Sequence, residues 1–230
     1  MRVLELFSGT KSVGKVAQEM GMEVVSVDID PRHSPDIQLD IRDFDETQYP
    51  RDHFQFIWAS PPCEAYSKCR SNVKGDDEVG RPRREEAMRS ADDLVRKTLM
   101  VIEYFDQASW CVENPAKSRL WGREVARGLA AQSVITSYCS YGARFRKDTQ
   151  ISSSLGLMLD RCPGEGRCPA MVGSRHLERA QQGGGGVSNR RHTLDELHSI
   201  PRKLVEVILR HVVNASGPRR RPPADVLQTR

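Results

Sequence analysis

Short apolar runs and helical apolar stripes alternate along most of the chain. Continuous apolar runs bounded by turn residues predict buried strands, and these runs lie at residues 3–7, 23–27, 54–59, 110–112 and 134–138. Apolar residues that recur every three or four positions predict helices, and these stripes lie at residues 11–20, 91–105, 120–131 and 194–213. The alternation is typical of an α/β fold, with a mostly parallel sheet and helices on both faces.

The pattern also divides the chain into four parts. Residues 1–155 carry the alternation and are expected to form the main domain. Residues 156–190 are rich in Gly, Pro, Cys and Arg, which predicts a small irregular excursion. Residues 191–214 return to helical periodicity and are expected to pack back on the main domain, whereas the Pro- and Arg-rich residues 215–230 are expected to be disordered.

Composition narrows the setting of the protein. The net charge of +4 permits a polyanionic partner without requiring one. No basic leader precedes the first strand and no run of about 18 apolar residues occurs, so we expect an intracellular protein outside the membrane. The six cysteines lack the spacing of a disulfide framework, and an intracellular compartment would keep them reduced.

The loop between the first strand and the first helix has the features of a ligand-binding turn. It contains Phe7, Ser8, Gly9 and Thr10. A glycine lets the backbone approach a ligand closely, and the N-terminus of the following helix offers unpaired N–H donors. We therefore expect these four residues to bind a cofactor.

Acidic residues follow the next two predicted strands. Asp28 ends the second strand about 20 residues after the loop, where α/β folds place a carboxylate against ribose hydroxyls. Asp40 is placed to contact an adenine amino group from the third strand. Together with Ile29 and Pro61, these residues complete the predicted cofactor-binding set.

The sequence of this loop discriminates among three classes of cofactor. A phosphate-binding P-loop is disfavoured because Val16 stands where the motif needs a hydroxyl for Mg²⁺. A nicotinamide dinucleotide is disfavoured because Lys11 replaces the second glycine of its motif. S-adenosylmethionine has a ribose and an adenine but no phosphates, and it fits this loop best.

A cysteine follows two prolines at the end of the strand at 54–59. Prolines fix the backbone angle φ, so Pro61 and Pro62 hold Cys63 rigidly at the edge of the sheet. A lone cysteine is often only a small buried apolar residue. Rigid placement at a strand end instead favours a nucleophile.

These segments resemble the motifs of a known family. Phe7–Gly9, Pro62–Cys63 and Glu113–Asn114 occur in the order of the cofactor, nucleophile and acid motifs of DNA cytosine-5 methyltransferases. The resemblance covers roughly residues 1–155. It implies a Rossmann-like fold that depends on S-adenosylmethionine as methyl donor, and double-stranded DNA as partner of a monomeric enzyme.

The resemblance also implies a covalent mechanism. Cys63 attacks carbon 6 of cytosine while Glu113 hydrogen-bonds or protonates ring nitrogen N3. Carbon 5 then takes the methyl group, and loss of its proton releases the enzyme. Because these carbons are buried inside a duplex, the target base must be flipped out.

Substrate contacts are expected in two segments. Residues 68–90 are basic and contain Gly75 and Gly80, which predicts a mobile loop that holds phosphates, with Ser67 and Lys68 at its start.

The second segment begins at Tyr141 and resembles the family's Tyr-Gly motif with downstream arginines, although the usual Pro-Gln and paired arginines are missing. We assign Arg146 to the catalytic set and Arg144 and Lys147 to substrate binding.

The chain departs from the family beyond residue 155. Only residues 156–190 are left for target recognition, residues 191–197 are merely similar to a late family motif, and the Gly-Asn-Ser-Val signature is absent. Together with the short chain, this suggests a minimal recognition element and a viral or phage-like branch.

The excursion also contains residues that could bind zinc. Cys162, Cys168 and His176 are candidate ligands, with Cys139 or His192 as a fourth. Their spacing is not that of a standard zinc finger, so the sequence favours simple loop cysteines and no metal.

Other functions stay open at this stage. Ser60-Pro61-Pro62 also resembles the motif of methyltransferases that act on exocyclic amino groups, but Cys63 stands where those enzymes need a stacking aromatic residue. An RNA cytosine-5 methyltransferase is a further alternative. A protein that binds S-adenosylmethionine and nucleic acid without catalysis is the last, although Cys63 and Glu113 fit it poorly.

Overall fold

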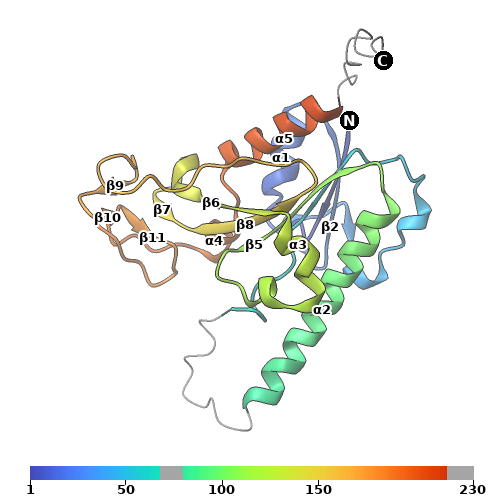
Figure 1. Ribbon diagram of the computed structural model, residues 1–230, viewed down its shortest axis with the longest axis horizontal. Coiled ribbons are helices and arrows are strands. Elements are labelled where there is room, and N and C mark those ends of the chain that lie inside the picture. The colour runs from blue at the N-terminus through green and yellow to red at the C-terminus, as the bar shows by residue number, and fades with distance from the viewer. Residues whose placement is uncertain (68–79, 217–230) are drawn as a thin grey trace, which may run out of the picture.

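A computed structural model describes residues 1–67 and 80–216 (Figure 1). Its centre is a seven-stranded sheet in the order β3-β2-β1-β4-β5-β8-β6. The strands are β1 (Arg2–Leu6), β2 (Glu23–Asp28), β3 (Ile37–Gln38), β4 (Phe56–Ala59), β5 (Ser109–Pro115), β6 (Ser133–Ser137) and β8 (Asp148–Ser153). The strands from β3 to β5 pair in parallel, whereas β8 is antiparallel to both β5 and β6. The α/β prediction is confirmed.

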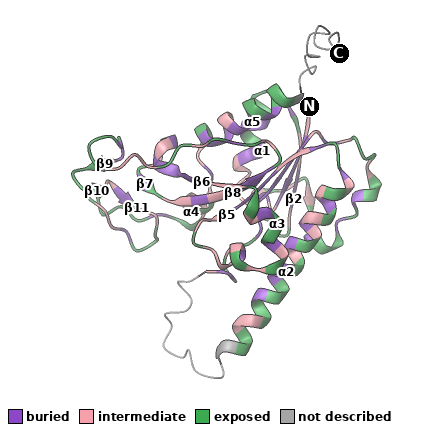
Figure 2. Cartoon of the chain, in the orientation of Figure 1, coloured by how far each residue is buried: buried purple, intermediate pink, exposed green. Residues whose placement is uncertain are grey.

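Helices cover both faces of this sheet. One face packs against α1 (Ser12–Glu19) and α5 (Arg202–Ser216), and the other against α2 (Gly80–Tyr104) and α3 (Arg127–Ala131) (Figure 1). Alternate residues of a strand point to opposite faces, so Val3 joins the first core and Leu4 the second. Figure 2 shows the buried residues concentrated in the central strands. Among the described residues, no helix is both long and apolar enough to cross a membrane.

The excursion contains short strands. They are β9 (Met171–Val172), β10 (Arg175–His176) and β11 (Glu178–Arg179). β9 and β10 form an antiparallel pair, and β11 pairs in parallel with β7 (Phe145–Arg146), which lies between β6 and β8 in the sequence. The segment is therefore paired with the connection between β6 and β8 rather than with the main sheet, and it projects from one end of that sheet (Figure 1).

Two predicted elements differ in the structure. The loop predicted at 68–90 is wrong for residues 80–90, because α2 begins at Gly80, and residues 68–79 lie outside the described residues. Met88 and Ala91 extend the buried face of α2 toward its N-terminus, which favours the longer helix. The helix predicted at 120–131 is broken, because Arg123 is extended between two 3₁₀ turns and donates to Asp92 at 2.6 Å.

A third element was not predicted at all. β8 carries only one large apolar residue, Ile151, and buries the hydroxyl residues Thr149 and Ser152.

The predicted helix at 194–213 is present as α4 (Leu194–His198) and α5, which are separated at Pro201 as expected. The predicted disordered tail lies outside the described residues from 217 onward.

A buried carboxylate joins β1 to α1. Glu5 is 2% exposed and accepts the backbone N–H groups of Val13 and Gly14, each at 3.0 Å. These donors belong to the first turn of α1, where backbone N–H groups have no partner within the helix. Glu5 therefore fixes the start of the helix against the sheet, directly behind the Phe7–Thr10 loop.

Gly14 is required for this close approach. A Cβ atom at Gly14 would lie 2.5 Å from Glu5 Oε2 and 3.2 Å from Val24 Cγ1. We expect Gly14→Ala to lower the free energy of unfolding by about 1–3 kcal/mol, because the helix and strand must separate. Gly128→Ala is the matched control: its Cβ meets no atom within 4 Å, and alanine favours the helix by about 0.5–1 kcal/mol. Denaturant unfolding checks both, and equal stabilities would contradict the packing argument.

The same carboxylate makes stability depend on pH. Burial raises the pKa of Glu5 from 4.5 to about 7, against the two backbone hydrogen bonds, which lower it. A raised carboxyl pKa stabilises the fold below about pH 4.5, and this contribution is lost as the pH rises through 7. We expect the wild type to lose up to about 3 kcal/mol of unfolding free energy across this range that Glu5→Gln does not lose. Parallel stability curves for the two proteins would refute the assignment.

Candidate active site

One cavity of about 390 Å³ opens at the carboxyl ends of β1, β2, β4 and β5. In open α/β sheets, ligands bind outside this edge. Most of the residues singled out from the sequence line it together: Phe7, Ser8, Gly9, Thr10, Asp28, Ile29, Pro61, Cys63, Glu113 and Lys147. The predicted cofactor end and the predicted catalytic end therefore share a single cavity.

The loop after β1 has an unusual backbone. Phe7 and Gly9 both have positive φ, at 56° and 45°, although only glycine adopts this region readily. The Gly9 N–H donates to Asp28 Oδ2 at 2.7 Å, and the Asp30 N–H donates to Asp28 Oδ1 at 2.8 Å. Asp28 thus holds the ends of β1 and β2 together, and each of its oxygens keeps capacity to accept a further hydrogen bond.

The first half of the cavity suits a nucleoside. Ser8 Oγ is buried and has no hydrogen-bond partner within residues 1–67 and 80–216. A buried hydroxyl without a partner is costly and indicates a ligand that supplies one. Ile29 lines the same cavity and is 63% exposed, so it offers an apolar surface to a flat ring. Hydroxyl, carboxylate and apolar surface fit the ribose and adenine of S-adenosylmethionine.

The loop that carries Cys63 is anchored on both sides. Asn114 Nδ2 donates to the Pro61 carbonyl at 2.8 Å, and Asn114 is 1% exposed. Downstream, the buried Tyr66 donates its hydroxyl to Asp92 on α2 at 2.8 Å. Cys63 is therefore held between the end of β5 and the middle of α2.

The thiol of Cys63 is electrostatically constrained. Burial raises its pKa, and the nearby Glu113 raises it further, whereas Lys147 lowers it. Lys147 donates to the Leu197 carbonyl at 2.7 Å and lies 4.9 Å from the centre of the Tyr138 ring. Lys147, which favours the thiolate, is thus fixed by backbone and aromatic contacts.

Glu113 is positioned by the unpredicted strand β8. It is 7% exposed, and Thr149 on β8 donates its hydroxyl to Glu113 Oε1. The same hydroxyl lies 3.0 Å from the Asn114 carbonyl. Register in the antiparallel pair sets these neighbours, since Glu113 faces Ile151 and Asn114 faces Gln150. The carboxyl group is therefore fixed at the cavity wall beside the Cys63 loop.

Sequence reasoning missed the residues that close the cavity from the C-terminal side. Asp195, His198 and Ile200 line it, and none was assigned a role beforehand. Ser199 Oγ donates to Thr10 Oγ1 at 3.1 Å, which links residues 189 positions apart. The capping box at the start of α4 can be read from the sequence. It predicts that a helix begins there, but not that this helix packs against the cavity.

Several predicted site residues lie elsewhere. Asp40 accepts from Arg42 in a 3₁₀ turn and does not line the cavity. Arg146 pairs with Asp148 at 2.8 Å, and Arg144 with Glu178 at 3.2 Å, both outside the cavity. Ser67 ends the first described segment and also does not line it, and Lys68 lies outside the described residues.

Comparisons with known proteins give the family. The sequence matches no family model. A curated protein of frog virus 3 (isolate Goorha), named "Probable DNA (cytosine-5)-methyltransferase", is 32% identical over 198 residues, which cover 81% of this chain and 89% of that protein.

Solved structures are similar at lower identity. The S. pombe Dnmt2 methyltransferase matches 66% of this chain with 16% identity, a TM-score of 0.44 and 48% of its own length covered. The Entamoeba histolytica methyltransferase EhMeth matches 76% of this chain with 14% identity, a TM-score of 0.46 and 58% of its own length covered. The chain spans about half the length of these two structures.

The alignment with the viral relative covers 81% of this chain and 89% of the relative, and an identity of 32% over 198 residues is too extended to rest on isolated motifs. The motif residues at 7–9, 62–63 and 113–114 stand in the order of the family in one sequence and line or border one cavity in the fold. The chain belongs to the DNA (cytosine-5)-methyltransferase family.

Proposed function

We propose that this protein transfers a methyl group from S-adenosylmethionine to carbon 5 of cytosine in DNA, through a covalent adduct between Cys63 and carbon 6. One observation carries the proposal: Cys63 and Glu113 line the same cavity as Ser8 and Asp28, which form its nucleoside-binding half. A nucleophile, a carboxyl group and a nucleoside site at one strand edge match the needs of this reaction.

The cofactor is assigned to the cavity half formed by β1 and β2. Asp28 is suited to accept from the ribose hydroxyls, Ser8 Oγ to gain its missing partner, and Ile29 to contact the adenine ring. When bound, S-adenosylmethionine supplies an electrophilic methyl group. Ser199 and Ile200 close this half by their hydrogen bonds to Thr10 and Ser12, and so exclude water from the transfer.

The nucleophile must ionise before it attacks. Because burial raises its pKa, Cys63 is expected to rest as a thiol and to lose its proton when the substrate site fills, with Lys147 favouring the charged form. The thiolate forms a bond to carbon 6, and the electron pair of the 5,6 double bond moves into the ring. Glu113 hydrogen-bonds or protonates N3 and so limits the negative charge that develops there.

The adduct then takes up the methyl group. The electron pair at carbon 5 forms the bond to the methyl group as the bond from that group to the sulfonium sulfur breaks, with S-adenosylhomocysteine as the leaving group. Loss of the carbon 5 proton to a base restores the double bond as the bond between carbon 6 and Cys63 breaks, and the enzyme is released. Asn114 and Thr149 touch Pro61 and Glu113, so they act by position.

DNA is proposed as the substrate because the viral relative is named for DNA cytosine. A cavity formed at the sheet edge takes a base only when the base leaves its stack. Residues 156–190 are proposed as the recognition element. Exposed Arg175 and Arg179 line a second cavity of about 260 Å³ there with Arg146, and such guanidinium groups suit phosphates.

An oligonucleotide with 5-fluorocytosine tests the mechanism, because fluorine cannot leave carbon 5 as a proton and the adduct accumulates. With labelled S-adenosylmethionine, we expect wild-type protein to form an adduct that survives a denaturing gel. Cys63→Ser is expected to form none, and Glu113→Gln to slow adduct formation by about 10²–10⁴-fold.

Duplex DNA, single-stranded DNA and RNA of one sequence serve as matched substrates. Methyl transfer that is undiminished in Cys63→Ser, without any adduct, would refute the covalent mechanism and favour amino-group methylation. An adduct formed on RNA alone would instead overturn the choice of polymer.

A further inference from the structure

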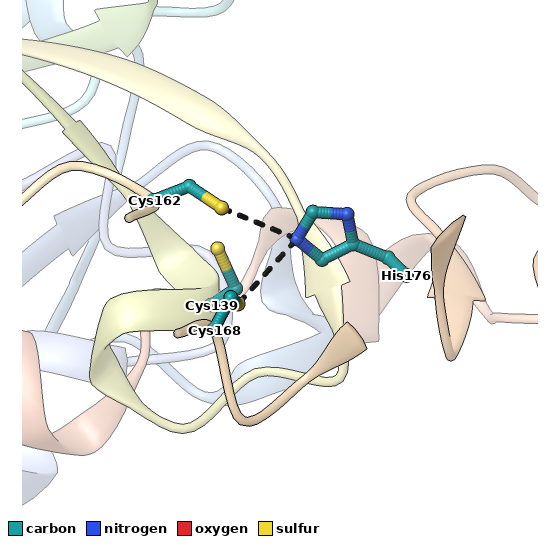
Figure 3. Close-up of side chains that lie close together, drawn as sticks. All are labelled: Cys139, Cys162, Cys168 and His176. Carbon is teal, nitrogen blue, oxygen red and sulfur yellow. Dashed lines mark hydrogen bonds between the residues drawn. The ribbon is translucent and has the colours of Figure 1, made fainter. Parts of the chain in front are cut away.

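Four side chains that the proposed reaction does not use converge at the base of the excursion. They are Cys139, Cys162, Cys168 and His176. Figure 3 shows the three sulfur atoms gathered beside one imidazole nitrogen, with Cys162 and Cys168 joined to it by dashed lines. His176 Nε2 lies 3.5 Å from Cys162 Sγ and 3.7 Å from Cys168 Sγ. The four ligand atoms all lie within 4.8 Å of one another.

These side chains come from separate parts of the fold. Cys139 belongs to the 3₁₀ turn that follows β6 in the main sheet, whereas His176 lies on β10. Cys162 and Cys168 come from the loop between them. Gly164 lets this loop turn back, since its φ is +84° and its carbonyl accepts the Cys168 N–H at 2.9 Å. The fold therefore brings distant residues together at one point.

The geometry matches that of a metal centre. In a tetrahedral zinc site with Zn–S bonds of about 2.3 Å, neighbouring ligand atoms lie about 3.5–3.8 Å apart. The two sulfur-to-nitrogen distances of 3.5 and 3.7 Å fall in this range. All three thiols are free of disulfides, and Cys139 and Cys168 are only 1% and 5% exposed.

We propose that Cys139, Cys162, Cys168 and His176 bind one zinc ion as a structural site. Three thiolates and one imidazole form a soft donor set that suits Zn²⁺ in tetrahedral coordination. Four protein ligands complete that coordination and leave no open position for a substrate or a water molecule, which distinguishes a structural site from a catalytic one.

The surroundings suit three thiolates around one dication. The guanidinium of Arg146 lies near Cys139 and Cys162. Arg146 also pairs with Asp148, which anchors it to β8 beside the cluster. A guanidinium here offsets the net negative charge of a site with three thiolates and one Zn²⁺.

The excursion has little else to hold it. The buried side chains within residues 156–190 are Leu157, Cys168, Ala170 and Glu178. So small a core rarely stabilises a segment alone, and metals commonly replace the missing apolar burial. Because Cys139 lies in the turn that directly follows β6, the ion would join the excursion to the main sheet. It would also fix β10, whose Arg175 lines the second cavity with Arg146.

His192, considered from the sequence as a fourth ligand, has other partners. Its Nε2 lies 3.3 Å from Glu178 Oε2, and its Nδ1 lies 3.7 Å from Glu196 Oε2. The structure therefore selects Cys139, which the sequence offered only as an alternative.

Metal analysis of untagged, full-length protein tests the site. We expect about one zinc per chain in the wild type and a loss of at least about tenfold in Cys162→Ser and His176→Ala. Cys162 is half-buried in a loop, so its replacement least threatens the fold. Cys63→Ser removes a thiol outside the cluster and is expected to retain the zinc.

Cobalt substitution and hydrogen exchange give readouts that are independent of methyl transfer. Co²⁺ is expected to give the visible bands of a tetrahedral thiolate site in the wild type and not in Cys162→Ser. Chelation is expected to raise amide exchange in residues 160–180 while β1 and β4 stay protected. A substoichiometric zinc content, a disulfide within the cluster, or stoichiometric iron or copper in place of zinc would overturn the proposal. None of these outcomes bears on the adduct with Cys63.

Discussion

The hydrogen bond from the Asn114 amide to the Pro61 carbonyl holds the two halves of the chemistry together. Glu113 precedes the donor directly, and Cys63 lies two residues beyond the acceptor, so one bond of 2.8 Å sets where acid and nucleophile stand. Thr149 fixes the other side of Glu113 from β8. Two strands and a proline-stiffened loop thus form one rigid wall, which suits a reaction that depends on the placement of groups.

The sequence could predict which residues meet at the edge formed by β1, β2, β4 and β5, because the information for these strands is local. β1, β2, β4 and β5 are short apolar runs, and each carries one chemically useful residue within four positions of its end: Gly9, Asp28, Cys63 and Glu113. The carboxyl ends of parallel strands meet at one edge, so strand order was not needed to bring the residues together. Asp40 also follows a parallel strand, β3, but it pairs with Arg42 and does not line the cavity. Arg146 likewise pairs with Asp148, and motif similarity reveals neither of these short-range ion pairs.

What the sequence could not predict depends on tertiary contacts. β8 is an interior strand with buried hydroxyl residues, and no apolar pattern in the sequence indicates it. Its backbone hydrogen bonds are satisfied by pairing with β5 and β6. The sequence of the first turns of α2 has the composition of a charged loop. In the fold, Arg123 pairs with Glu85 and Asp92 on that helix, a contact that the sequence does not reveal. The cluster at Cys139 likewise needs the return of β10 to the sheet, which the irregular spacing of its cysteines conceals.

The closure of the cofactor half by Ser199 and Ile200 has a consequence for the order of folding. Their partners, Thr10 and Ser12, lie 189 and 188 residues earlier in the sequence, so the pocket can be completed only after residues 199 and 200 have been synthesised. Contacts of such sequence separation form late because loop closure costs entropy. A ligand that binds only the closed form would hold the two ends of the chain together and raise the stability of the whole domain through mass action.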